Sequence, residues 1–337
     1  MAITIRQIAE RAGVSTATVS NVIHGKIHKV SSDTVRRVRR IMDEMGYQQE
    51  IGNRVSRDTK LVAVLIHYNY WFENSVLADP FYGVVTGSME EALRRHDTGM
   101  LLYASRNIEE ILLALRKWDV DGMIAVSFSC EDCGKLYHLM RKPMISIDAT
   151  GEIPNPVPNI GLDDEGGGFL MLQHLLELGY EHIYMAGGAN DGIDHRRWIG
   201  AKQIRSTSLF LERRAKLEFL PLGFSRDVRE NRYREIVRQV PFKRKTAFFF
   251  TADSLAMEAM GIFAAWGIRI PQDAGVAGFD NSFNAVHFSI PPLTTIHQDI
   301  REKGRIAVEE LVSALQNPDY IPRSHILPVS LVKRQSV

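Results

Sequence analysis

Four residues with short side chains share one face of a helix predicted near the N-terminus: Thr16, Ala17, Ser20 and Asn21. An asparagine amide can pair with adenine through two hydrogen bonds, and the methyl groups of threonine and alanine can contact thymine. The alternative is the solvated face of a small helical bundle, for which an alanine and short polar side chains would be a poor choice. We therefore predict that Thr16, Ala17 and Asn21 contact base edges in the major groove of DNA.

Three short helices are predicted to position this face. Thr4, followed three residues later by a glutamine, has the spacing of a capping box that begins a first helix, and Gly13 follows as its stop. Ser15 can cap a second helix, and Ser31 or Ser32 can cap a third. A helix, a tight turn and a second helix form a helix-turn-helix, whose second helix enters the major groove.

The charge distribution supports contact with nucleic acid. The first 60 residues contain 11 Lys and Arg against 6 Asp and Glu, a net charge of +5, whereas the rest contains 30 against 34, a net charge of −4. Because phosphate affinity is electrostatic, a basic segment on a slightly acidic body is the footprint of a sequence reader. Four further residues around the predicted reading helix are candidates for DNA contact: Thr4, Ser15, His24 and His28.

Beyond residue 60 the sequence alternates between short apolar runs and amphipathic segments. Strands are predicted at 61–66, 100–104, 144–148, 182–188 and 246–251, and helices at 83–96, 168–179, 227–238 and 254–266, among others. Strands separated by helices of this length imply parallel sheets with right-handed crossovers. Two such sheets would place a cleft at the carboxyl ends of their strands, where a small molecule can bind.

The stretch from Ile5 to Ile23 has the pattern I-x-x-I-A-x-x-A-G-V-S-x-A-T-V-S-x-V-I and resembles the opening of the lac repressor/galactose repressor (LacI/GalR) family. The likeness covers essentially the whole chain. It implies an α/β fold, with an N-terminal three-helix helix-turn-helix head and two Rossmann-like subdomains of the type I periplasmic-binding-protein kind.

The resemblance also implies domain boundaries. The DNA-binding domain is expected at 1–47, a hinge at 48–60, and an effector-binding and dimerisation domain at 61–337. Within that domain the N-subdomain is expected to span about 61–160 and 293–322, and the C-subdomain about 161–292 and 323–337.

A ligand site in the cleft between the subdomains follows from the same resemblance. Six residues stand where the family contacts its ligand: Phe81, Asp148, Arg197, Phe224, Asp280 and Gln298. The fork of donors on an arginine suits vicinal hydroxyls or a carboxylate, and buried ligand hydroxyls need polar partners. The alternatives are core packing for the two phenylalanines, a turn-stabilising role for Asp280, and a structural ion pair for Arg197.

Two segments depart from the family pattern. Ala252 stands where the family usually carries an asparagine that hydrogen-bonds the ligand. The hinge lacks the usual proline and the leucine that wedges into the minor groove, although Asn53 and Arg54 keep part of the pattern. We predict that Val55 is the apolar wedge, with Ile51 as the second candidate. We also predict that the hinge helix is weaker or shifted, since Gly52 lowers helix stability.

Other functional classes find little support. Cys130 and Cys133 form a C-x-x-C pattern without a second pair, which we interpret as incidental rather than as a zinc site. No arrangement of Ser, His and Asp and no pair of His residues points to an enzyme, and no cofactor or metal is predicted. The absence of a signal peptide or a long apolar run, together with only two cysteines, predicts a cytoplasmic protein without a membrane partner.

The sequence therefore predicts a transcriptional regulator, acting as a repressor. We expect a homodimer on a pseudo-palindromic double-stranded DNA operator, controlled by a small effector such as a mono- or disaccharide. One alternative is a sugar-binding protein or sugar-active enzyme with an incidental helix-turn-helix. The other is a regulator that has lost its response to an effector, for which Ala252 is the single indication.

Overall fold

The computed structural model describes residues 3–23, 30–45, 47, 60–68, 75–151, 157–188, 192–223, 225–239 and 245–337. The chain divides into two compact units, Met1–Thr59 and Lys60–Val337, which we call the head and the body. The head contains the predicted helix-turn-helix, and the body contains the predicted alternation of strands and helices.

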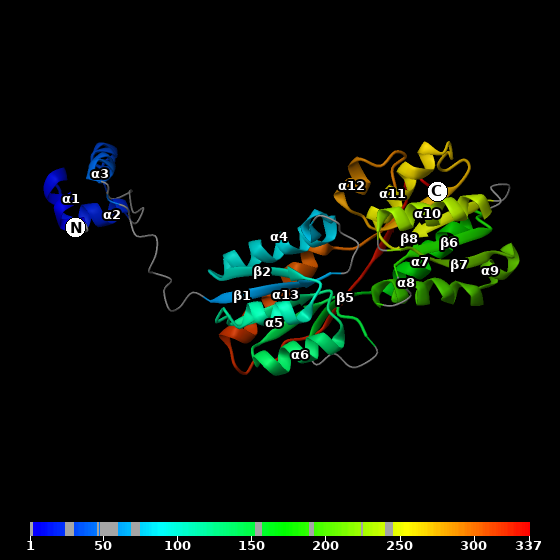
Figure 1. Cartoon of the computed structure of the whole chain (residues 1–337), viewed down its shortest axis with the longest axis horizontal. Helices are drawn as coiled ribbons and strands as arrows, with labels where there is room; N and C mark the ends of the chain where they lie inside the picture. Colours follow the sequence, from blue (N-terminus) through cyan, green and yellow to red (C-terminus); the bar gives the residue numbers. More distant parts are fainter. Residues whose placement is uncertain are drawn as a thin grey trace. The chain divides into compact units, whose positions relative to one another are not determined.

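The head consists of three helices, α1 (Ile5–Ala12), α2 (Thr16–Ile23) and α3 (Ser32–Met45) (Figure 1). Both hydrogen bonds of the predicted capping box are present between Thr4 and Gln7, and Gly13 ends α1 in the left-handed conformation at φ 62°. The Ser15 hydroxyl accepts from the Thr18 amide at 3.1 Å, and the Ser31 hydroxyl accepts from the Thr34 amide at 3.4 Å. The predicted helix starts are confirmed.

A small apolar core holds the three helices together. Its buried members are Ile8, Ala9, Ala12, Val19, Val22, Val35, Val38 and Ile41. They recur every three or four residues on each helix, so each helix turns one apolar stripe inward. Burying one face of α2 in this core leaves the opposite face to solvent.

The body contains two sheets of six strands (Figure 1). The first has the order β11-β5-β4-β3-β1-β2, and all its strand pairs are parallel. Its strands are β1 (Leu61–His67), β2 (Gly99–Ser105), β3 (Gly122–Val126), β4 (Met144–Ile147), β5 (Asn159–Leu162) and β11 (His325–Leu327).

The second sheet has the order β12-β10-β9-β8-β6-β7, in which only the pair β10–β12 is antiparallel. Its strands are β6 (His182–Gly187), β7 (Lys216–Pro221), β8 (Thr246–Phe250), β9 (Gly275–Asp280), β10 (Thr294–His297) and β12 (Ser330–Val332). The central strands of both sheets are buried along nearly their whole length, as expected when helices cover both faces.

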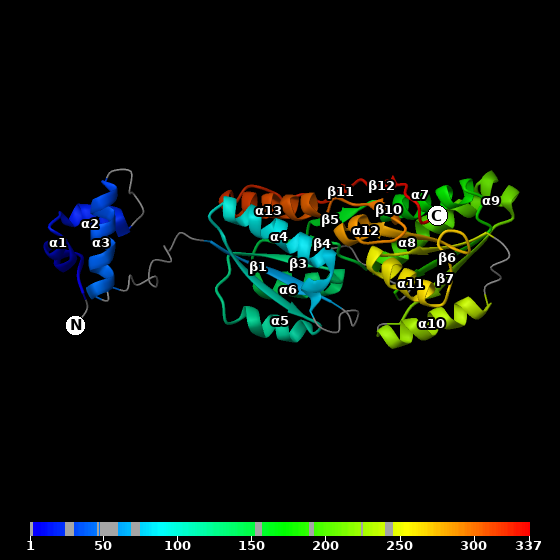
Figure 2. The ribbon, with the colours of Figure 1, turned by 90° about the horizontal axis from the view of Figure 1, so that it is seen from above.

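Helices flank both sheets, and together each sheet and its helices form a lobe. The first lobe carries α4 (Pro80–Arg95), α5 (Ile108–Leu115), α6 (Cys130–Met140) and α13 (Ile300–Gln316), with η2 (Val76–Ala78) before α4. The second carries α7 (Asp164–Glu177), α8 (Gly192–Gln203), η3 (Ile204–Ser206), α9 (Ser208–Arg213), α10 (Arg226–Gln239), α11 (Asp253–Ala265) and α12 (Phe283–His287). Figure 2 shows α4 and α13 on one side of the first sheet, with α5 and α6 on the other. The predicted α/β class with two parallel-sheet subdomains is confirmed.

The chain crosses between the lobes later than the family pattern led us to expect. Strand β10 pairs with β9 in the second sheet, and β11 pairs with β5 in the first. One crossing therefore comes after His297, and the predicted boundary near 293 moves to that point. Another crossing lies between Leu327 and Ser330, and it replaces the predicted boundary near 323. The sheet to which a strand belongs is fixed by hydrogen bonding, because the strand's backbone N–H and C=O groups need partners on a neighbouring strand.

No helix in the described part of the chain is both long and apolar enough to cross a membrane. This finding agrees with the absence of a long apolar run in the sequence.

Close packing of α4 against α13 depends on Gly304. A methyl group added at Gly304 would lie 2.0 Å from the Ser88 hydroxyl and 2.9 Å from the Val85 carbonyl oxygen. We expect Gly304→Ala to lower the free energy of unfolding by about 1–3 kcal/mol, the usual cost of overpacking. Chemical denaturation measures this, and adding Ser88→Ala should restore part of the loss. The matched control is Gly261→Ala on α11, where nothing lies within 4 Å of the added atom and no loss is expected.

Candidate functional site

Polar residues gather where strands of both lobes end. Asp148 follows β4 directly, Asp280 is the last residue of β9, and Gln298 follows β10. Asp148 and Asp280 adopt positive φ angles of 53° and 121°, a conformation that costs energy for residues other than glycine. The carboxyl ends of parallel strands are the usual binding position in such sheets, so the strain lies where a site is expected.

A chain of hydrogen bonds joins these three residues through Lys303 of α13. The Lys303 ammonium donates to both carboxylate oxygens of Asp148, at 2.9 and 2.7 Å, and to Gln298 Oε1 at 3.0 Å. Gln298 Nε2 in turn donates to Asp280 Oδ1 at 2.5 Å. Lys303 is 0% exposed and Asp148 is 7% exposed, so this is a buried ion pair. The chain connects the first lobe to the second, and the three Lys303 protons are all used within it.

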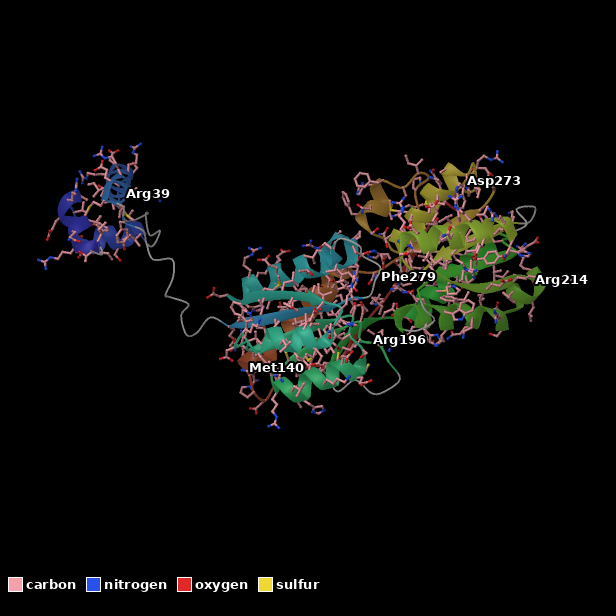
Figure 3. All side chains as sticks on the ribbon, in the orientation of Figure 1. Arg39, Met140, Arg196, Arg214, Asp273 and Phe279 are labelled. Carbon is pink, nitrogen blue, oxygen red and sulfur yellow. The ribbon has the colours of Figure 1, made fainter. Side chains whose placement is uncertain are left out.

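Arg197 of α8 lies in the second lobe and is equally buried. Its Nε donates to Asp164 Oδ1 at 2.9 Å, and one terminal nitrogen donates to the backbone carbonyl of Thr251. The guanidinium lies 3.6 Å from the centroid of the Phe279 ring, a cation–π contact. The structural ion pair considered for Arg197 is thus present. Figure 3 labels Phe279 and the neighbouring Arg196 on the part of the second lobe that adjoins the first.

The carboxylates of this region influence one another. Burial raises the pKa of Asp280 well above its usual value, and the charges of Asp253 and Asp79 add to this, whereas Arg197 opposes it. Burial likewise raises the pKa of Asp164, again with Arg197 opposing. Burial raises the pKa of Asp79 to about 6. Such pKa shifts are typical of functional sites, although structural ion pairs also produce them.

The start of α4 forms another part of the same region. Asp79 caps this helix by accepting from the Phe81 amide at 2.9 Å, and the Phe81 ring centroid lies 5.3 Å from the Lys303 ammonium. The Tyr82 hydroxyl donates to Ser127 Oγ at 3.2 Å. Phe81 therefore lies beside Lys303, the residue that pairs with Asp148.

Of the six predicted ligand residues, the structure brings five into this cluster: Phe81, Asp148, Arg197, Asp280 and Gln298. Phe224 lies outside the described residues. We define the polar cluster as Asp79, Phe81, Asp148, Asp164, Arg197, Asp280, Gln298 and Lys303. Its role in binding stays a prediction.

Sequence reasoning missed three charged members of the polar cluster. Lys303 carried a usable signal, because it lies three residues after Ile300 and four before Ala307, on the apolar stripe of α13. A lysine on such an apolar stripe is almost never fully buried unless it has a charged partner. In the sequence Asp79 and Asp164 resemble ordinary residues at the start of a helix, and no neighbouring residue marks them as members of a buried site.

The structure also shows the positions of Ala252 and of the two cysteines. Ala252 is the N-cap of α11 and makes no side-chain capping bond, so the departure from asparagine removes a polar group at a strand end. Cys130 and Cys133 are free and buried, and burial raises the pKa of the Cys133 thiol to about 12. A thiol in that environment is unreactive. Among the described residues, no group of His, Cys, Asp or Glu is placed to hold a metal ion.

The reading face of the head is open to solvent. Thr4, Ser15, Thr16 and Ala17 are exposed, and Ser20 and Asn21 are half-exposed. The other predicted DNA contacts, His24, His28, Asn53, Arg54 and Val55, lie outside the described residues, as does the hinge at 48–59.

The basic face of α3 is partly neutralised by its own carboxylates. Arg36 pairs with Asp33 at 2.5 Å and Arg40 with Glu44 at 3.5 Å. Within the described part of the chain Arg37 and Arg39 have no ion-pair partner, and Arg39 extends outward from the helix (Figure 3). Contact of these two exposed arginines with phosphate stays a prediction.

Comparisons with known proteins agree with both units. Residues 4–50 match the model of the bacterial regulatory proteins of the lacI family, and residues 172–337 match the periplasmic binding protein-like domain. The HTH-type transcriptional repressor PurR of Aliivibrio fischeri (strain MJ11) is 28% identical over 350 residues, covering 99% of this chain and 98% of the relative.

Solved structures extend the likeness. A complex of the transcriptional regulator CelR with cellobiose matches with a TM-score of 0.70 and 25% identity, covering 99% of this chain and 100% of that one. The lac repressor dimer bound to operator and the anti-inducer ONPF matches with a TM-score of 0.70 and 25% identity, covering 100% of this chain and 99% of that one.

Proposed function

We propose, from the premise that this chain belongs to the LacI family of transcriptional repressors, that it acts as a dimer on a pseudo-palindromic operator under the control of a small polyol. Sequence-specific DNA binding and repression follow from the family. The dimer, the operator symmetry and the effector are our proposal. The cytoplasm is the compartment in which such a regulator would meet its DNA.

The observation that carries the effector proposal is the polar cluster at the strand ends of both lobes. A ligand that replaced any bond of the chain from Asp148 through Lys303 and Gln298 to Asp280 would change how the lobes are held together. If ligand binding changes the operator affinity by some factor, operator binding must change the ligand affinity by the same factor. The related regulator solved with cellobiose supports a sugar as ligand.

The dimer proposal has support from an apolar surface on the second lobe. Phe283, Phe288 and Ile290, on and after α12, are 63%, 64% and 91% exposed. Clustered exposed apolar side chains mark interaction surfaces. A second copy is the occupant we propose, because one helix-turn-helix reads only a half-site and a related repressor is a dimer on its operator.

An operator must first be selected from a random duplex pool with the full-length protein. Fluorescence anisotropy at constant salt then measures the affinity for the selected duplex, for a half-site and for random DNA. We expect two chains per full site, weak binding to the half-site, and a shift of the curve with at least one mono- or disaccharide. Selection of no sequence at all, with sugar binding intact, would instead support a sugar-binding protein with an incidental head.

A further inference from the structure

The polar cluster has more carboxylates than cations. Its acidic members are Asp79, Asp148, Asp164 and Asp280, and its basic members are Lys303 and Arg197. Lys303 is paired with Asp148, and Arg197 with Asp164. Among the described residues neither Asp79 nor Asp280 has an ion-pair partner within 4.0 Å, so two carboxylates of the cluster lack a cation of their own. Buried carboxylates without a cation are unfavourable in the charged form.

Among the described residues, one carboxylate oxygen of the cluster has no hydrogen-bond partner. Asp164 is 2% exposed, its Oδ1 accepts from Arg197, and its Oδ2 is buried without a partner. The charges of Asp148 and Lys303 both act on this carboxyl group, so it belongs to the same cluster. A buried acceptor without a partner is costly in a folded protein, so a ligand donor beside this oxygen would be stabilising.

The described residues do not form a metal site that could supply a donor to this oxygen. In the part of the chain that the structure describes, no three acidic, His or Cys side chains are close enough together to hold a metal. An ammonium group needs only one or two carboxylates as acceptors, while hydroxyls on the same molecule can use the remaining ones. The Phe81 ring beside Asp148 and Lys303 adds an apolar surface for a sugar ring.

We propose that the effector of this site is an amine-bearing polyol of the amino-sugar class, with its ammonium near the two carboxylates that interact with Arg197, those of Asp164 and Asp280. This inference rests on the proposed function, since it assigns a ligand class to the same cleft. It assigns Asp164 and Asp280 as the residues that select an amine over a hydroxyl. A charge-assisted hydrogen bond is stronger than a neutral one, and the ligand would supply the charge that the cluster lacks.

The test compares matched ligands on the full-length protein. The probes are 2-amino-, 3-amino- and 6-amino-deoxyglucose, each beside its N-acetyl derivative and the parent glucose, with glucose 6-phosphate as the anionic probe. Calorimetric binding and the shift of the operator curve are both measured. We expect one amino sugar to bind at least about tenfold more tightly than its N-acetyl derivative and the parent.

Variants that remove one carboxylate charge show which residue produces the preference for an amino sugar. Asp280→Asn keeps the shape of the side chain, and we expect it to reduce the preference for the amine over the parent sugar by about tenfold. The control is Asp273→Asn in the same lobe, whose carboxylate pairs with Arg269 at 2.7 Å. Figure 3 labels Asp273 well away from Phe279. That variant should leave the preference unchanged.

Three outcomes would overturn the inference. Tighter binding of a neutral sugar or of glucose 6-phosphate, with the operator curve shifted, would refute the amine while leaving the proposed function in place. An amine preference that survives Asp280→Asn would remove the ammonium from this cluster. No response to any sugar in either measurement would reject effector control by a polyol together with the amine.

Discussion

Replacing Lys303 by methionine is expected to lower the free energy of unfolding by about 3–5 kcal/mol, the cost of leaving one member of a buried ion pair alone. Lys303 is 0% exposed and, in the described part of the chain, is the side chain that donates to both oxygens of Asp148. Methionine is of similar length and fills the same space, so the loss reports charge rather than a cavity. Denaturation by urea, followed by circular dichroism, measures the change.

The double variant Asp148→Asn with Lys303→Met separates the ion pair from packing. Removing both charges leaves no isolated buried carboxylate, and neutral replacements of buried pairs are often tolerated. We expect the double variant to be more stable than Lys303→Met alone, which gives a favourable coupling energy between the two positions. If Lys303→Met is as stable as the unmodified protein, water reaches Asp148 and the pair does not hold the lobes.

Replacing Asn21 by alanine is expected to weaken binding to the selected operator by roughly 5- to 150-fold, the equivalent of about 1–3 kcal/mol for one bidentate base contact. Asn21 is half-exposed on α2, while Val19 and Val22 on the other face are buried in the core of the head. The substitution therefore removes a polar group from the reading face without disturbing the core. Anisotropy titration with the selected duplex and with random DNA measures both affinities.

The pattern of losses distinguishes base reading from general attraction. Asn21→Ala should weaken binding to the operator and leave binding to random DNA nearly unchanged. Arg39→Ala is the contrasting variant, since a phosphate contact lowers affinity for every sequence and reduces the salt dependence by about one ion. Equal losses on operator and random DNA for Asn21→Ala would assign Asn21 to the solvated face.

Local signals in the sequence were sufficient for the head. The capping box at Thr4, the stop at Gly13 and the serine cap at Ser15 each involve residues within four positions of one another. The apolar stripes have the period of a helix, and burying them forces the reading face outward. For these reasons the three helices and their exposed faces could be predicted from the sequence alone.

The lobes were predictable in class but less so in their boundaries. Alternating apolar and amphipathic segments indicate parallel sheets, but they do not say which sheet receives a strand that follows a crossover. Strands β10 and β11 joined the sheets opposite to those expected, because their pairing with β9 and β5 is decided by partners far away in the chain.

The amino-acid sequence by itself determined that the chain has a DNA-reading head and a two-lobed body, because periodicity and capping act over a few residues. The family resemblance also named Asp148, Asp280 and Gln298 as candidate ligand residues. Only the tertiary structure decided how these residues are joined, because Lys303 meets Asp148 across 155 positions and Arg197 meets Asp164 across 33. Charge balance in a buried site depends on such distant pairs, and no local pattern records which carboxylate remains without a partner.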